Sequence, residues 1–251
     1  TYGVIAKEDL DKLYAYRQQN WKKVHTFDGD VTDRDDVLRA FHSTTDIVIH
    51  LASYPRAKIV NANPMLGVRN IVEGTVNLLW HCDKLKVKKF VFVSSSMIYG
   101  HYADGTKEDE DSKPNNLYGE SKLVAERYTK HYHTHYGVEY NIARPSGVYG
   151  PGDMDDRVLS KFFTQAMANK TIEVHDGSNK VDFTYVDDTA NGIVKCALGI
   201  ENNKSFNITA GNAISLREAA ERIIKLTGSK SKIVDIGMNK LYPRRGTLDI
   251  T

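Results

Sequence analysis

The sequence has little of several features that would indicate specialised classes of protein. It contains two cysteines, and Cys82 and Cys196 do not form a CxxC motif, so we expect no disulfide framework and a reduced, cytoplasmic protein. No apolar run approaches ~18 residues, so we expect no transmembrane helix and no membrane partner. The 34 basic and 32 acidic residues leave a net charge of +2, which offers nucleic acid no broad basic surface.

What is present is ordinary for a soluble globular protein. Of the 251 residues, 41% are hydrophobic and 26% are charged, enough for a sizeable core. Short apolar runs indicate buried parallel strands at 24–27, 46–52, 89–94 and 139–143. Helical patterns lie between or after them at 33–41, 65–84 and 118–136. This alternation predicts an α/β fold with a doubly wound parallel sheet and helices on both faces.

The pattern changes after Gly150-Pro151-Gly152. Strands are expected at 172–175, 181–186 and 205–209, and helices at 157–169, 189–198 and 216–226. Ser215 is a plausible N-cap for the last helix, with Glu218 three residues later. We therefore predict one domain over residues 1–150 and mainly a smaller mixed lobe over residues 151–251.

Tyr118 and Lys122 stand four residues apart in the predicted helix at 118–136. Side chains at i and i+4 share one helix face, so the phenol and the ammonium can point into the same cleft. A nearby ammonium favours the phenolate and lowers its pKa, which suits removal of a proton from an alcohol. The spacing alone is common, and a chance pairing on a surface helix remains open.

Ser94, Ser95 and Ser96 follow an apolar strand. Open α/β sheets bind ligands at the carboxyl ends of their strands, and a serine there can contact a substrate oxygen and a catalytic phenol together. The alternative is a polar loop that only caps the strand. Similar pairs of interpretations apply to Asp30-Val31-Thr32-Asp33, which can hold an adenine or cap a helix, and to the small residues Ala52 and Ser53, which can admit a cofactor or simply end a strand.

Several longer segments occur in one characteristic order: DVTD, DIVIHLA, NIVEGTVNLL, KKFVFVSSSMIYG, YGESKLVAER, ARPSGVYGPGD, KVDFTYVDDTA and FNITAGNAISLREAAERI. Together they resemble the NAD-dependent epimerase/dehydratase family of extended short-chain dehydrogenases/reductases, including its UDP-glucose/galactose 4-epimerase-like members. The similarity runs over residues 24–251. It implies a Rossmann domain with a small C-terminal substrate lobe, NAD as the cofactor, and a nucleotide sugar as the substrate.

The resemblance also implies roles for individual residues. Ser95, Tyr118 and Lys122 are the expected catalytic residues, and no metal is expected. The expected cofactor contacts are Asp30, Val31, Leu51, Ala52, Ser53, Asn70, Ser94, Tyr118, Lys122, Pro145 and Ser146. The expected substrate contacts are Ser95, Ser96, Gly147 and Arg244, of which Arg244 resembles an arginine that grips a diphosphate.

Some family features are missing from the sequence. None of the 18 glycines forms the GxxGxxG turn that holds a pyrophosphate in this family, so we expect that the first strand and its glycine loop are not in the chain. We expect the lobe to be truncated as well, because the chain stops where the family leads into a final helix. Gly147 occupies a place where many nucleotide-sugar enzymes carry Asn, and RPSGVYGPGD also resembles the hydroxysteroid dehydrogenase branch.

The residues after Ser95 narrow the expected reaction. Dehydratases and decarboxylases of this family place an acid one or two positions after the catalytic Ser or Thr, but here these positions are Ser96 and Met97, which cannot provide acid–base help. We expect an NAD-dependent epimerase that oxidises a nucleotide sugar to a keto-sugar and re-reduces it, at C4 of a UDP-sugar. The alternatives are an NAD(P)-dependent, hydroxysteroid-dehydrogenase-like oxidoreductase and a non-catalytic dinucleotide sensor. A homodimer that pairs the helices at 65–84 and 118–136 is expected from the resemblance.

Overall fold

The computed structural model describes residues 24–153, 156–199 and 201–251. Its centre is a parallel sheet with the strand order β1-β2-β3-β6. The strands are Ile47–His50 (β1), Lys89–Val93 (β2), Tyr140–Pro145 (β3) and Lys204–Ile208 (β6). The expected α/β fold with a parallel sheet is thereby confirmed.

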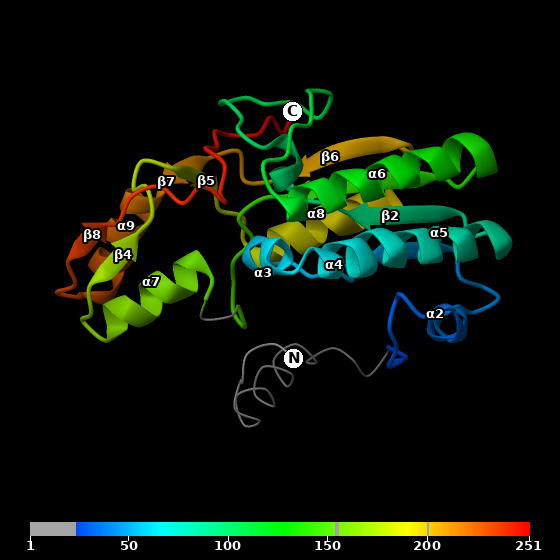
Figure 1. Cartoon of the computed structure of the whole chain (residues 1–251), viewed down its shortest axis with the longest axis horizontal. Coiled ribbons are helices and arrows are strands. Elements are labelled where there is room, and N and C mark those ends of the chain that lie inside the picture. The colour runs from blue at the N-terminus through cyan, green and yellow to red at the C-terminus, as the bar shows by residue number, and fades with distance from the viewer. Residues whose placement is uncertain (1–23, 154–155, 200) are drawn as a thin grey trace.

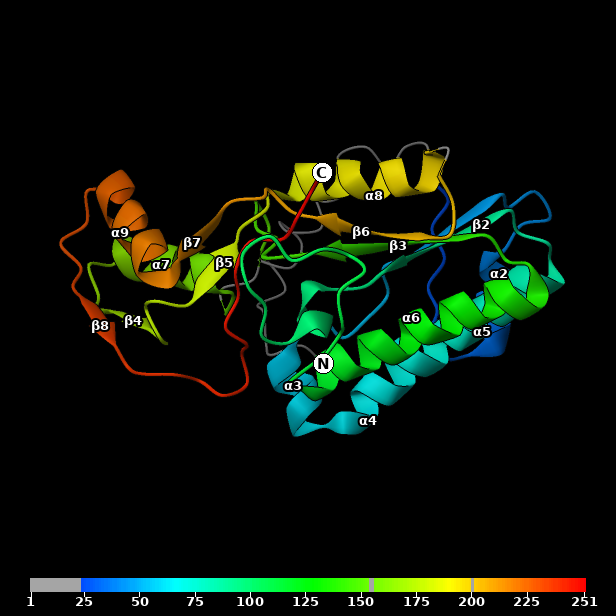
Figure 2. The same ribbon diagram turned by 90° about the horizontal axis from the view of Figure 1, so that it is seen from above.

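Helices cover both faces of this sheet (Figures 1 and 2). The helices α5 (Gly74–Lys84) and α6 (Leu117–Tyr136) lie on one face, and α8 (Val186–Leu198) lies on the other. Alternate residues of β2 serve the two layers: Phe90 and Phe92 pack in the core beneath α5 and α6, whereas Val91 packs in the core beneath α8. This alternation explains why the strand is a continuous apolar run, since a strand buried on both faces has no polar side.

The strand expected at 24–27 is not formed, and that prediction is wrong. Val24 and Phe27 are 56% and 63% exposed, and the described residues of this segment lie in no strand. A strand requires a neighbour to supply its ladder hydrogen bonds. In the usual doubly wound order 3-2-1-4, the third strand is separated from the fourth by two others. In that order, residues 24–27 take the place of the third strand and β1 takes the place of the fourth. The two are therefore not neighbours and cannot pair.

The other elements of the first half follow the expected order. α2 (Arg34–Ala40) begins after Asp33, whose carboxylate caps the backbone N–H groups of Asp35 and Asp36. The helix expected at 65–84 is continuous but changes geometry, because α4 (Pro64–Gly67) passes into a π-helical stretch, η2 (Val68–Glu73), before α5. The short helices α3 (Ala57–Ala62) and η3 (Ser96–Tyr99) were not predicted.

A second, smaller unit lies beside one end of the sheet (Figure 1). It contains α7 (Val158–Met167), α9 (Leu216–Thr227) and two small sheets. The strands β4 (Ile172–Val174) and β8 (Ile233–Asp235) pair in parallel, and β5 (Lys180–Asp182) and β7 (Ala213–Ser215) pair antiparallel. The predicted cap of α9 is confirmed, because the N–H of Glu218 donates to Ser215 Oγ at 3.1 Å.

The chain after residue 150 contributes to both units, because α8 and β6 return to the large sheet. Its last residues also cross back and pack beside the loop that follows η3. The N–H of Tyr102 donates to the carbonyl of Arg244 at 3.1 Å, and the N–H of Gly246 donates to the carbonyl of Tyr102 at 2.9 Å. A Cβ at Gly246 would lie 2.3 Å from the carbonyl carbon of Ala103, so this close approach requires glycine.

Candidate active site

The predicted catalytic helix is α6, and its first turn is closely fitted to η3. Asn116 caps the helix by accepting a hydrogen bond from the N–H of Gly119 at 2.9 Å. A Cβ at Gly119 would lie 2.6 Å from the carbonyl oxygen of Met97, so only glycine allows the helix to approach this loop. The fit brings Tyr118, on α6, beside Ser95, the residue that precedes η3.

The hydroxyl group of Ser95 lies close enough to that of Tyr118 to act on its pKa. Burial raises the pKa of the Tyr118 phenol, while the Ser95 hydroxyl and the positive charge of Arg157 oppose that rise. The expectation that Lys122 lowers this pKa is not met: the cation that acts on Tyr118 is Arg157, and burial has the larger effect. Ser95 and Tyr118 nevertheless lie beside each other in the structure.

Lys122 is 2% exposed and lies one turn after Tyr118. Its Nζ donates to the carbonyl of Val93, the last residue of β2, at 2.7 Å, and lies 4.8 Å from the ring centroid of Phe92. Burial lowers the pKa of Lys122 to about 7, and the negative charge of Glu126 opposes that change. The amine is thus fixed beneath the end of the strand, between the sheet and the helix.

Three buried hydroxyl groups without hydrogen-bond partners follow three adjacent strands. In the described part of the chain, Ser53 follows β1, Ser94 follows β2 and Ser146 follows β3, and the Oγ atom of each is buried and unpaired. A buried polar group without a partner is unfavourable and calls for an explanation such as a bound ligand. Their position at the carboxyl ends of parallel strands is where open α/β sheets bind dinucleotides. These residues therefore fit a dinucleotide cofactor.

The remaining predicted cofactor residues lie around this edge with their own contacts. Asp30 accepts hydrogen bonds from the N–H and the hydroxyl of Thr32, both at 2.8 Å. The carbonyl of Val31 accepts from the side chain of Asn77 on α5 at 2.8 Å. Leu51 and Ala52 are exposed directly after β1, Pro145 ends β3, and Asn70 donates to the carbonyl of Leu66 in its own helix at 3.1 Å.

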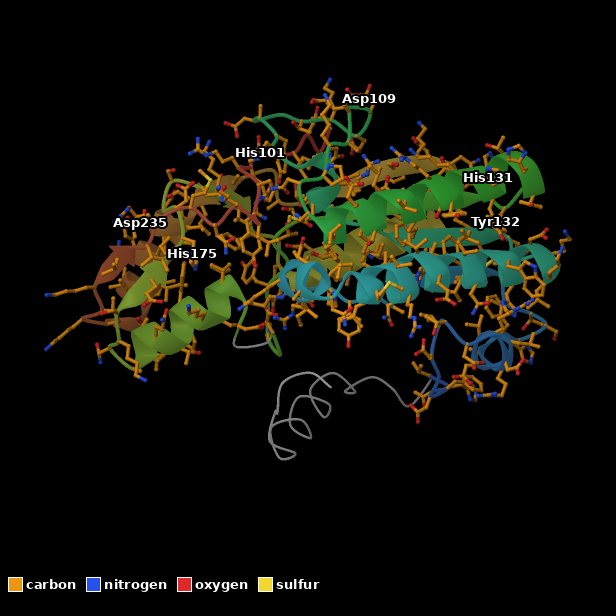
Figure 3. The ribbon with its side chains drawn as sticks, viewed as in Figure 1. His101, Asp109, His131, Tyr132, His175 and Asp235 are labelled. Carbon is orange, nitrogen blue, oxygen red and sulfur yellow. The ribbon has the colours of Figure 1, made fainter. Side chains whose placement is uncertain are left out.

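A cavity of about 430 Å³ lies between the second unit and the loop after η3. Its charged and amide lining comprises Asp104, Asp176, Asn179, Lys180, Arg244 and Arg245. Lys180 pairs with Asp104 at 3.1 Å. Arg244, whose side chain is 67% exposed, lies 3.8 Å from Asp176. The loop at this junction carries His101, whose Nδ1 accepts a hydrogen bond from the N–H of Arg244 at 3.0 Å (Figure 3).

Two residues of the site were missed by the sequence analysis, Tyr102 and Arg245. Both line the cavity, and both have buried polar atoms without hydrogen-bond partners among the described residues, the hydroxyl of Tyr102 and the Nε of Arg245. The signal that could have drawn attention to Arg245 is its place beside Arg244 in the RRG motif. No sequence signal marked Tyr102.

Gly147, a predicted substrate contact, has no room for a side chain. Its φ is +48°, and a Cβ would lie 2.4 Å from the carbonyl oxygen of Asp182. Its own carbonyl accepts a hydrogen bond from the N–H of Thr184 at 3.3 Å. Gly147 therefore fixes the loop after β3 against the second unit, and it can contact a substrate only through its backbone. Ser96, another predicted substrate contact, is buried near the hydroxyl of Tyr102.

The described residues contain neither a candidate metal site nor a candidate membrane-spanning helix. No group of three or more His, Cys, Asp or Glu side chains is arranged to hold a metal ion within residues 24–153, 156–199 and 201–251. Within the same ranges, no helix has both the length and the apolar character needed to cross a membrane.

Comparison with known proteins gives a consistent assignment. The NAD dependent epimerase/dehydratase family matches residues 6–209. The UDP-glucuronate 4-epimerase of Thermodesulfobacterium geofontis is 30% identical over 244 residues, which cover 92% of this chain and 75% of that protein. A UDP-glucuronic acid 4-epimerase structure from Bacillus cereus, with UDP-glucuronic acid and NAD, has a TM-score of 0.85 at 26% identity, covering 96% of this chain and 78% of that one.

A dehydratase has a similar fold. The dTDP-glucose 4,6-dehydratase of Streptomyces venezuelae, solved as a double mutant with NAD bound, superimposes with a TM-score of 0.88. Its identity is 23%, and the match covers 95% of this chain and 74% of that one. At this identity the likeness concerns the fold, and the choice between epimerase and dehydratase chemistry depends on the residues of the site.

Proposed function

The chain belongs to the NAD dependent epimerase/dehydratase family, and within it we propose that the protein is a nucleotide-sugar epimerase acting at C4 of a UDP-sugar. Family membership makes it an NAD-dependent enzyme. The proposed reaction oxidises a ring hydroxyl to a keto-sugar and then reduces the keto group from its other face. The observation that carries the proposal is that the Ser95 hydroxyl lies close to the Tyr118 phenol, next to the buried Lys122.

Tyr118 and Ser95 would share the proton transfer and the positioning of the substrate. Bound NAD would supply the hydride acceptor in oxidation and the donor in reduction. Tyr118 would remove the hydroxyl proton and later return it, while Ser95 orients the reacting oxygen through its own hydroxyl. Burial raises the pKa of Tyr118 and favours its protonated form, which opposes removal of the hydroxyl proton and suits its return to a keto oxygen. Ser53, Ser94 and Ser146 are the proposed cofactor contacts.

The residues after Ser95 support epimerisation over dehydration. Elimination of water from a keto-sugar needs an acid–base group beside the reacting carbon. The two positions after Ser95 are Ser96 and Met97, and both are buried. Neither side chain carries a carboxyl group, so the proposed site can support transient oxidation but has no acid at this place for elimination.

The polar cavity supports a nucleotide sugar over an apolar substrate. A pocket for a steroid-like molecule would be lined mainly by hydrophobic side chains, whereas six of the ten residues that line this cavity are charged or carry an amide. For the diphosphate, the geometry favours Arg245 over the predicted Arg244. Arg244 is exposed beside Asp176, but the Nε of Arg245 is buried and unpaired among the described residues, so a phosphate could accept its hydrogen bond.

We also propose a cytoplasmic homodimer that pairs α5 and α6 across the interface. The exposed faces of these helices and of η2 carry large apolar side chains, including Val68, Trp80 and Tyr128. Exposed apolar residues on adjacent helices suit burial against a second copy. Sedimentation velocity on the wild type and on a Trp80→Glu variant would test this proposal, since the variant should shift toward monomer.

Assays with UDP-glucose, UDP-galactose, their N-acetyl forms and UDP-glucuronic acid, on which two of the similar proteins act, test the proposed activity. Wild type should interconvert one pair, and Tyr118→Phe should abolish turnover while retaining NAD binding. Tyr136→Phe, an exposed tyrosine at the end of the same helix, is the matched control and should keep full activity. Absence of interconversion would refute the epimerase assignment. Stoichiometric reduction of added NAD with a hydroxylated apolar substrate would support the oxidoreductase alternative instead.

A further inference from the structure

We infer that Tyr102 is a specificity-determining residue, whose hydroxyl binds a hydroxyl group of the sugar while Arg245 beside it binds the attached phosphate. This inference rests on the proposed function and adds to it a residue that no motif indicated. Its basis is a convergence of buried polar groups from segments far apart in the sequence.

Tyr102 is held firmly in place. Its backbone is hydrogen-bonded on both sides to the C-terminal segment, through Arg244 and Gly246, at 3.1 and 2.9 Å. Its ring packs edge-on against Tyr99, with ring centroids 5.8 Å apart. Because the backbone and the ring are both fixed, the position of the hydroxyl is set before any ligand binds.

The hydroxyl of Tyr102 lies among groups that can bind a ligand. The hydroxyls of Ser96 and Ser146 are its neighbours, and the charges of Arg245 and Asp182 act on it. The Tyr102 hydroxyl, the Ser146 hydroxyl and the Nε of Arg245 are buried without hydrogen-bond partners among the described residues. One oxygen of the buried Asp182 is also unpaired there. A ligand carrying several oxygens and hydroxyl groups could satisfy these atoms together.

The order of these groups indicates which part of a ligand each one meets. Ser96, a neighbour of the Tyr102 hydroxyl, directly follows the proposed catalytic Ser95, which relates Tyr102 to the reacting sugar. Arg245 is also a neighbour of Tyr102 and lines the cavity with it. The neighbouring cations Lys180 and Arg244 already face Asp104 and Asp176, whereas Arg245 has no ion-pair partner in the described ranges of the chain. A sugar joined to a phosphate matches this sequence of hydroxyl groups and cation.

Burial raises the pKa of Tyr102, so its hydroxyl keeps its proton at neutral pH and can donate a hydrogen bond to a sugar oxygen. Removing that hydroxyl should therefore weaken binding of the sugar part and spare binding of the nucleotide. The guanidinium of Arg245 should contribute to the binding of both ligands, because both contain the phosphates. A Tyr102 variant should therefore lose affinity only for the nucleotide sugar, whereas an Arg245 variant should lose affinity for the nucleotide alone as well.

Titration calorimetry with UDP and with UDP-glucose, on protein saturated with NAD, tests the inference. Tyr102→Phe should weaken UDP-glucose binding by about threefold to tenfold, the loss of one hydrogen bond, and change UDP binding less than twofold, ~0.4 kcal/mol by the usual conversion. Arg245→Ala should weaken both ligands alike, and Tyr136→Phe, at an exposed tyrosine, should weaken neither. Circular dichroism melting would confirm that each variant is folded.

The outcomes separate this inference from the proposed function. Equal weakening of UDP and UDP-glucose by Tyr102→Phe, or no effect on either, would overturn the role of Tyr102 and leave the epimerase proposal standing. If wild type binds neither ligand, the nucleotide-sugar assignment itself fails, and the role of Tyr102 fails with it. Steady-state kinetics should agree, with a raised KM for the nucleotide sugar and a kcat close to wild type.

Discussion

Arg144 and Glu126 form a buried ion pair, with Nε and Nη2 of the arginine 3.1 and 2.8 Å from the two carboxylate oxygens. Arg144, on β3, also donates to the hydroxyl of Tyr99 at 2.8 Å and to the carbonyl of Glu108 at 2.7 Å. Glu126 lies one turn after Lys122 on α6. The pair therefore ties α6 to the sheet and to η3, and its carboxylate opposes the loss of charge on Lys122.

Glu126→Gln should destabilise the protein strongly, because the guanidinium of Arg144 would remain buried without its counter-charge. Breaking a buried pair by removing one partner costs about 3–5 kcal/mol, which urea denaturation would measure. Glu218→Gln is the matched control, since Glu218 pairs with Arg222 on the surface at 2.6 Å. An exposed helical pair contributes only about 0.3–0.5 kcal/mol. Equal losses in the two variants would contradict the prediction.

Gly119→Ala should impair activity by displacing the first turn of α6. The new Cβ would lie 2.6 Å from the carbonyl oxygen of Met97 and 2.9 Å from Cβ of Pro114, so the helix must move away from η3. Overpacking of this kind costs about 1–3 kcal/mol, and a shift of Tyr118 by about 1 Å can reduce turnover about 100-fold.

Glu120→Ala, in the same turn of α6, provides the control for this change. Glu120 is exposed, so we expect wild-type turnover. Full activity of Gly119→Ala in the same assay would show that the spacing between α6 and η3 is not critical.

Lys122→Met should stabilise the protein more at neutral pH than at high pH. Burial lowers the pKa of Lys122 from 10.5 to about 7, so between these values the unfolded chain binds a proton that the folded protein does not. The wild type therefore gains stability from this group as pH rises, by up to about 1.4 kcal/mol per pH unit. Methionine removes that dependence, and urea denaturation at about pH 7 and pH 10 would show it. Lys130→Met, an exposed lysine on α6, should leave the pH dependence unchanged.

His50 should make the protein sensitive to acid. Its Nε2 lies 3.0 Å from the hydroxyl of Thr75, and burial together with the charge of Lys122 lowers its pKa from 6.5 to about 3. As pH falls through this range, the unfolded chain takes up a proton that the folded protein excludes, so stability falls. His50→Gln should flatten the decline between about pH 6.5 and pH 5. His131→Gln, at the end of α6 far from the cleft (Figure 3), should keep the wild-type slope.

The sequence predicted the elements whose pattern is local. β2 is a continuous apolar run because both of its faces are buried, and α9 has a serine cap and a glycine end that can be identified without any tertiary information. The segment at 24–27 has a strand-like composition but exposed side chains, because pairing depends on a neighbour and not on composition. Local patterns therefore identified elements well and could not establish their partners.

In the candidate site too, the sequence pattern indicated some of the neighbouring residues and missed others. Tyr118 and Ser95 come together because α6 and the end of β2 belong to one βαβ unit, which the sequence pattern indicates. The choice between Arg244 and Arg245 depends on how the last residues lie against Tyr102, and this register is fixed only by the folded chain. Tyr102 was missed for the same reason, since its neighbours come from four separate segments.

The chain passes repeatedly between the large sheet and the second unit: from β3 to α7, from β5 to α8, from β6 to β7, and from β8 back to the loop after η3. Four peptide connections thus join the two units along one side. Bending at these connections can change the angle between the units, but the second unit cannot slide along the sheet or separate from it. A protease that cuts one of these links would leave the two halves joined by the others, so neither half is a detachable module.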